Sequence, residues 1–172
     1  MFGADNQQFV RGGVNMIKVN VVAVGKVKEK YFADGIAEYK KRLSRFCDFS
    51  IVEIAEENYN KVDDAVIRTI KEKEGERILP HLKGYVFAMA IEGGKTSSEK
   101  LARTIDGLSA RGNGVITFVI GGSYGLSDAV KSSADSLLSF SDMTFPHTLF
   151  RLMLVEQIYR AFSINCGTAY HK

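Results

Sequence analysis

The residues whose types and spacing could do chemistry fall in two loops and at the end of the chain. The first loop, "VIGGSYGLSDAV", runs from Val119 to Val130 after an apolar run. Its glycines permit a sharp turn and a close approach of the backbone to a ligand. It matches neither G-x-G-x-x-G on a first strand nor G-K-[ST]. The loop therefore indicates either a ligand-binding turn or an ordinary tight turn between strand and helix.

The second loop, "SFSDMTFPH", runs from Ser139 to His147. It combines small hydroxyl groups, one carboxylate and two phenylalanines, and Pro146 follows. Backbone groups in such a loop could read the edge of a base while Phe and Met side chains flank the ring. An ordinary loop whose phenylalanines fill the core explains the pattern equally well.

The last helical segment carries two polar residues on one face, because His147 and Arg151 are four residues apart. Arg151 either contacts a phosphate or substrate, or forms an ion pair with Glu156. Apolar residues surround most of this helix, which is typical of a helix buried on more than one side. A second apolar face in a domain of this size favours a partner subunit.

The composition is that of a soluble globular protein: 172 residues, 45% hydrophobic and 25% charged. Its net charge of +3 is compatible with an RNA partner and does not require one. No apolar run approaches the ~18–20 residues of a membrane span. Cys47 and Cys166 lie far apart in the sequence, which indicates free thiols and a cytoplasmic protein. The three histidines form no cluster, so no metal site is expected.

Strands alternate with helices along the chain, which predicts one α/β domain over residues 16–172 with a mainly parallel sheet. Residues 1–15 are polar and without periodicity, and we expect them to be a leader added for expression. The expected strands are Ile17–Val24, Phe49–Ala55, Gly84–Gly93, Gly114–Gly122 and Ser136–Ser141. The expected helices are Tyr31–Phe46, Val62–Leu82, one that is capped by Ser97 or Ser98 and runs to Arg111, and Pro146–Asn165. Pro80 should distort or end the second of these helices.

Three segments in combination resemble the RlmH (YbeA) family of small SPOUT-class ribosomal RNA methyltransferases. They are "FVIGGSYGLSDAV", "LSFSDMTFPHTLFRLMLVEQIYRAF" and the terminal "AYHK", and the resemblance extends from Met16 to Lys172. It implies an α/β fold with a C-terminal trefoil knot, and a homodimer. It also implies methyl transfer from S-adenosylmethionine to N3 of a pseudouridine in helix 69 of the 23S rRNA, on assembled ribosomes.

The resemblance also implies roles for particular residues. Its cofactor contacts would be Met89, Gly121, Phe140, Ser141, Asp142, Met143, Thr144 and Phe145. Its catalytic residues would be Tyr170, His171, Lys172, Arg151 and His147. Tyr170 would stack on a base or hydrogen-bond it, His171 would help to move a proton, and Lys172 would meet phosphate or developing negative charge. A sulfonium donor is already activated, so the reaction needs alignment of the acceptor and no metal.

Two other classes of function stay open at this point. A non-catalytic ribosome- or RNA-binding module of the same fold would bind ribosomes without affinity for the cofactor. Another nucleotide-cofactor enzyme, such as a dehydrogenase, is disfavoured by the absent dinucleotide motif. Within the methyltransferase hypothesis, transfer RNA is a rival substrate.

Overall fold

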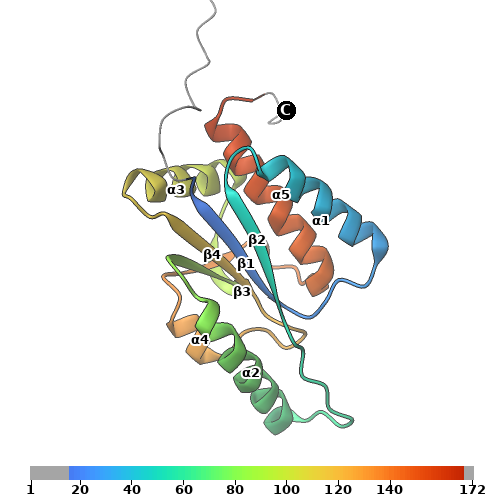
Figure 1. Ribbon diagram of the computed structural model, residues 1–172. Helices are drawn as coiled ribbons and strands as arrows, with labels where there is room; N and C mark the ends of the chain where they lie inside the picture. Colours follow the sequence, from blue (N-terminus) through green and yellow to red (C-terminus); the bar gives the residue numbers. More distant parts are fainter. Residues whose placement is uncertain (1–15, 169–172) are drawn as a thin grey trace, which may run out of the picture.

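The computed structural model of the protein describes residues 16–168. The expected leader and the tail residues Tyr170, His171 and Lys172 lie outside this range. Five parallel strands form one sheet in the order β2-β1-β4-β3-β5, which confirms the predicted α/β class (Figure 1). The strands are β1 (Lys18–Val24), β2 (Asp48–Ile54), β3 (Tyr85–Lys95), β4 (Val115–Ile120) and β5 (Ser136–Ser139).

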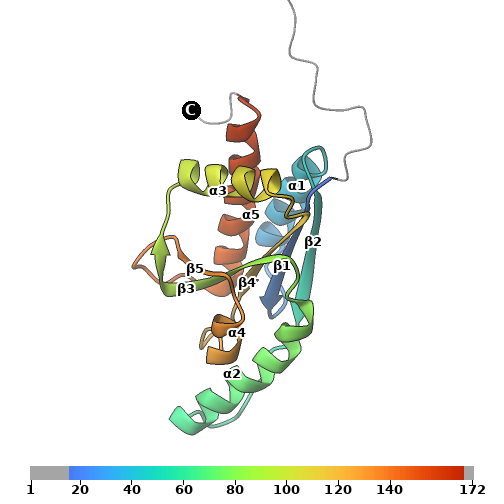
Figure 2. The same ribbon diagram turned by 90° about the vertical axis from the view of Figure 1, so that its left-hand side faces the viewer.

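Helices cover both faces of the sheet, as the turned view in Figure 2 shows. One face carries α1 (Lys30–Leu43), α3 (Ser98–Ala110) and α5 (His147–Asn165), and the other carries α2 (Asp64–Ile78) and α4 (Asp128–Ser132). Successive side chains of β1 point to opposite faces of the sheet and so contribute to a hydrophobic core on each face. Val21 packs under the first group of helices and Val22 under the second. The sheet is therefore buried on both sides, as parallel sheets usually are.

The element boundaries differ from the expected ones where local chemistry intervenes. α2 ends at Ile78, and Pro80 lies in a short 3-10 turn, because proline cannot continue the helical hydrogen bonds. The short helix α4 was not expected, although Ser127 caps it by accepting a hydrogen bond from the backbone N–H of Val130. β5 ends at Ser139, two residues early, so the chain enters the following loop sooner.

Most apolar residues of α5 are covered by other elements of the same chain. The helix packs against α1 and α3 as well as the sheet, and Leu154 and Ile158 are fully buried. Its pattern therefore does not by itself require a partner subunit. None of the helices within residues 16–168 is long and apolar enough to cross a bilayer.

Arg151 joins α5 to the ends of β1 and β2. Its side chain is 1% exposed and donates hydrogen bonds to Glu53 Oε1 at 2.7 Å and to the carbonyl oxygens of Val24 at 3.1 Å and Gly25 at 2.9 Å. Burial lowers the pKa of the guanidinium, and Glu53 acts in the opposite direction. The expected pair with Glu156 is wrong, because Glu156 binds Arg160 at 2.7 Å.

We expect Arg151→Met to lower the free energy of unfolding by about 2–4 kcal/mol, because two buried carbonyls and the half-exposed Glu53 lose their donor. Urea unfolding followed by circular dichroism measures the loss. Glu53→Gln is the matched control: it keeps an acceptor oxygen for Arg151, so its loss should be smaller. Wild-type stability in Arg151→Met would show that the buried cation does not hold α5.

Candidate active site

A hollow of about 390 Å³ lies at the carboxyl ends of β3, β4 and β5. Ligands of open parallel sheets bind at this edge, and the volume is within the usual range for small-molecule sites. Its walls come from the end of β3, the turn after β4, the loop before α5, one residue each of α2 and α4, and two residues of α5. Segments far apart in the sequence thus meet at one edge of the sheet.

The first wall is a detour in β3. Met89 pairs with Leu138 of β5, and Gly94 pairs with the same residue, so positions 90–93 leave the ladder between them. A Cβ atom on Gly93 would come within 2.6 Å of the Leu138 backbone nitrogen, so only glycine allows the strand to return. Met89 and the first three residues of the detour, at positions 90–92, line the hollow.

The second wall is the glycine turn after β4. A Cβ atom on Gly121 would lie 2.5 Å from the carbonyl carbon of Gly125, so the turn folds tightly on itself. Gly125 has a φ of +81°, which L side chains rarely adopt. Because residues 121, 122 and 125 have no side chains, the turn presents backbone to the hollow.

The third wall is the loop between β5 and α5. Ser139 Oγ donates to the carbonyl oxygen of Ser141 at 3.0 Å, and the backbone N–H of Met143 donates to Ser141 Oγ at 3.0 Å. Phe140 and Phe145 both pack against Phe150 of α5, with ring centroids 5.2 and 6.4 Å apart. The phenylalanines thus pack against α5 and also line the hollow, and the expectation that they flank a base stays a prediction.

The structure brings together seven of the eight predicted cofactor contacts. They line the hollow: Met89, Gly121, Phe140, Ser141, Met143, Thr144 and Phe145. Asp142 does not line it, because its carboxylate forms an exposed ion pair with Lys95. A local pattern could not foresee this, since the partner lies 47 positions away.

His147 also lines the hollow, one helical turn before Arg151. Its Nε2 would be 3.2 Å from a Cβ atom on Gly25, and Glu56 Oε2 would be 3.7 Å from the same point. Ser123 Oγ donates to the other oxygen of Glu56 at 3.4 Å. An imidazole and a carboxylate thus both lie close to Gly25, directly after the end of β1.

The predicted contact of Arg151 with phosphate or substrate stays a prediction. Its side chain is 1% exposed, Nη1 and Nη2 donate to Glu53 and the end of β1, and the buried Nε has no partner within residues 16–168. Arg151 shares a face with His147 as predicted, and it positions the first turn of α5. The predicted catalytic tail lies outside the described residues.

Several lining residues were not predicted. Lys71 of α2, Glu92 of the β3 detour and Lys131 of α4 meet at the mouth of the hollow, together with Ile91 and Tyr124. Lys131 forms an ion pair with Glu92, and this contact lowers the pKa of the Glu92 carboxyl. The capping sequence at Ser127 was the one signal that could have revealed α4 and so placed Lys131.

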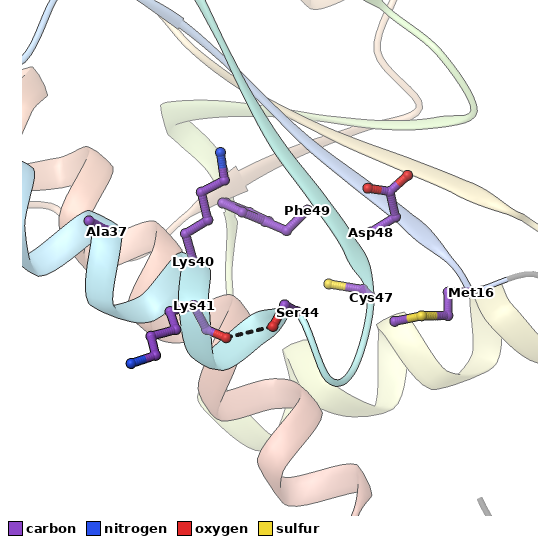
Figure 3. Close-up of a pocket in the computed structure, with 8 residues that line it drawn as sticks. All are labelled: Met16, Ala37, Lys40, Lys41, Ser44, Cys47, Asp48 and Phe49. Carbon is purple, nitrogen blue, oxygen red and sulfur yellow. Dashed lines mark hydrogen bonds between the residues drawn. The ribbon is translucent and has the colours of Figure 1, made fainter. Parts of the chain in front are cut away.

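A second, larger hollow of about 620 Å³ lies at the opposite end of the sheet (Figure 3). It is bounded by the end of α1 and the start of β2, including Lys40, Cys47 and Asp48. Burial, with a smaller contribution from Asp48, raises the pKa of the Cys47 thiol to about 12, so it is not a nucleophile near neutral pH. This hollow lies away from the strand ends where both predicted loops meet, and we do not assign the active site to it.

A buried carboxylate supports the glycine turn from below. Glu74 is 3% exposed, and its Oε2 would be 2.9 Å from a Cβ atom on Gly122. Its Oε1 accepts a hydrogen bond from the backbone N–H of Glu57 at 3.0 Å. Burial is the largest cause that raises the pKa of the Glu74 carboxyl, and the charges of Glu56 and Glu57 add to it.

We expect Glu74→Gln to melt at a higher temperature than the wild type at pH 7–8. A raised pKa in the folded state means that ionised Glu74 opposes folding, and this cost disappears as the pH falls to the ordinary value of 4.5. The difference in Tm should therefore shrink toward pH 4, while the Gln oxygen still accepts from Glu57. Glu76→Gln, on the exposed side of α2, is the control; an offset independent of pH in Glu74→Gln would contradict the expectation.

Comparison with known proteins agrees with this geometry. A family model described as "Predicted SPOUT methyltransferase" matches residues 17–171. Proteins named ribosomal RNA large subunit methyltransferase H from Bifidobacterium adolescentis and Lactobacillus delbrueckii subsp. bulgaricus are 52% and 50% identical over 159 residues, which cover 91% of this chain and 100% of each relative.

Among solved structures, a probable methylase family protein from Haemophilus influenzae Rd KW20 superposes with a TM-score of 0.48 and 10% identity, over 92% of this chain and 71% of the other. The family assignment rests on the family model and the full-length relatives, and not on this structural similarity. The chain belongs to the SPOUT methyltransferase family and, within it, to the group of ribosomal RNA large subunit methyltransferase H.

Proposed function

We propose that the protein transfers the methyl group of S-adenosylmethionine to N3 of a pseudouridine in helix 69 of large-subunit ribosomal RNA, on assembled ribosomes. The observation that carries this proposal is the match, at about half identity and over their full length, to relatives named for methylation of this RNA. The named family supplies the reaction class, and the resemblance of the two loops supplies the nucleotide.

The hollow fits S-adenosylmethionine by the chemistry of its walls. Its inner side chains are apolar, with Met89, Ile120 and Leu138 each less than 10% exposed, and they suit the faces of a purine. The glycine turn offers main chain where a side chain would block close approach. S-adenosylmethionine supplies a methyl group on a sulfonium, which is already activated for transfer.

The chain's own task is to hold the acceptor in line and to manage its proton. N3 of the acceptor base carries a proton that must be lost as the methyl group arrives. We assign this task to His147, whose imidazole lines the hollow and lies close to Gly25, as does the carboxylate of Glu56. Alignment of the reacting atoms is worth up to about 7–11 kcal/mol in such reactions.

The same resemblance suggests the oligomeric state, the C-terminal knot, the location in the cell and the role of the last residues. We propose a homodimer, a trefoil knot in the C-terminal part, and a cytoplasmic location where ribosomes are available. We further propose that Tyr170, His171 and Lys172 complete the active site, in the subunit to which they belong or in the partner.

Transfer of radiolabelled methyl groups tests the function directly. The substrate is 70S ribosomes from a strain that lacks this enzyme, and we expect label in the large-subunit RNA. Ribosomes without the helix 69 pseudouridine should take up none. Absence of label from a folded protein that binds ribosomes but not S-adenosylmethionine would favour the non-catalytic RNA-binding module, and label in transfer RNA alone would change the substrate.

Removal of residues 169–172 tests the tail. We expect the shortened chain to bind S-adenosylmethionine and self-associate like the full chain, and to lose at least a hundredfold in methyl transfer, since acceptor alignment and proton transfer each contribute factors of this order. Calorimetry and light scattering provide the two controls. Undiminished transfer by the shortened dimer would remove these residues from the active site.

A further inference from the structure

The mouth of the hollow is bordered by exposed apolar side chains. Within residues 16–168, seven large hydrophobic residues are exposed, and three of them, Ile91, Tyr124 and Met143, line this one opening. Their exposed fractions are 51%, 40% and 69%. Scattered apolar side chains on a surface need no explanation, whereas a group around one opening indicates a binding surface.

The same opening carries an excess of positive charge. Lys71 and Lys131 both lie near Glu92, but only Lys131 is paired with it. Lys71 is half-buried on α2 and forms no ion pair with any residue of the range 16–168. One carboxylate thus lies near two ammonium groups. The ammonium group of Lys71, which is not paired with it, favours an anionic ligand.

We propose that this rim, defined as Ile91, Tyr124, Met143, Lys71 and Lys131, receives single-stranded RNA at the target nucleotide. Tyr124 stacks on the base that is turned out toward the hollow, and Lys71 and Lys131 neutralise the phosphates beside it. The inference rests on the proposed function and deepens it, because it assigns the RNA contacts of the same site.

Position and chemistry favour RNA over other occupants. An exposed aromatic ring at the same opening as lysine side chains is the usual arrangement for binding unpaired nucleotides, through stacking and phosphate neutralisation. The inner wall, which suits the cofactor, is buried, whereas the rim stands at the opening where a second reactant must enter. Three apolar side chains and two lysines make a small patch compared with a stable protein interface.

Three variants test the rim: Tyr124→Ala, Tyr124→Phe and Lys71→Ala. The last of these breaks no ion pair within residues 16–168. The matched controls are Tyr31→Ala, which removes an exposed tyrosine of α1, and Lys83→Ala, which removes an exposed lysine before β3 at the opposite end of the sheet. For each we would measure kcat/KM for 70S ribosomes, the Kd for S-adenosylmethionine, and the salt dependence of ribosome binding.

We expect Tyr124→Ala to lower kcat/KM for ribosomes roughly ten- to a hundredfold, the range found for loss of one stacked base. Tyr124→Phe should stay close to the wild type, since the ring and not the hydroxyl does the stacking. Lys71→Ala should weaken ribosome binding and make its salt dependence shallower by about one phosphate contact. Cofactor affinity and both controls should be unchanged.

The proposal is overturned if Tyr124→Ala and Lys71→Ala bind and methylate ribosomes like the wild type, or if the controls lose as much. It is also overturned if both variants lose affinity for S-adenosylmethionine, because the rim would then belong to the cofactor site. Absence of methylation by the wild type would instead count against the proposed function. The rim would then be judged by ribosome binding: unchanged affinity and salt dependence in the variants would overturn it, and a loss confined to them would support it.

Discussion

The guanidinium of Arg151 joins three chain segments that are far apart in the sequence. It reaches from α5 to Glu53 on β2 and to the last carbonyls of β1, in a place almost closed to water. Its Nη1 and Nη2 atoms donate to these acceptors, while its buried Nε has no partner within residues 16–168. Because a buried cation is costly without acceptors, these contacts determine where the first turn of α5 lies. His147, one turn earlier, is consequently held against Gly25, and the loop from Ser139 must span to that point. One side of the candidate site thus depends on a buried ion.

The other walls are formed by strand geometry and have little to do with charge. β3 leaves its neighbour after Met89 and returns at Gly94, and the turn after β4 closes on itself through glycines. The glycine turn presents backbone to the hollow, and the detour brings the side chains of Ile91 and Glu92 to it. The shape of the hollow is therefore set by a few positions that tolerate no Cβ atom, while the apolar residues behind them belong to the ordinary core.

Much of this could be predicted from the sequence, for local reasons. Runs of β-branched residues indicate buried strands, and glycine and proline mark where the strands end. For this reason the five strands and both site loops were located correctly. α4 was missed because five residues are too few to show a helical period. The role of Arg151 was missed because two of its three acceptors are main-chain carbonyls, which no pattern of side chains reveals. Lys71 and Glu92 meet only after folding, so their proximity had no local signature.

The hollow draws its walls from both sides of the sheet. Lys71 and Lys131 come from the layer of α2 and α4, while His147 and Phe150 come from α5 in the opposite layer. A ligand held there bridges two hydrophobic cores that otherwise meet only through the strands. A ligand that binds only the folded site stabilises every element that forms the site. Its binding should therefore stabilise the helices of both layers against unfolding. Amide hydrogens in the helices on both faces of the sheet should thus exchange more slowly when the site is filled.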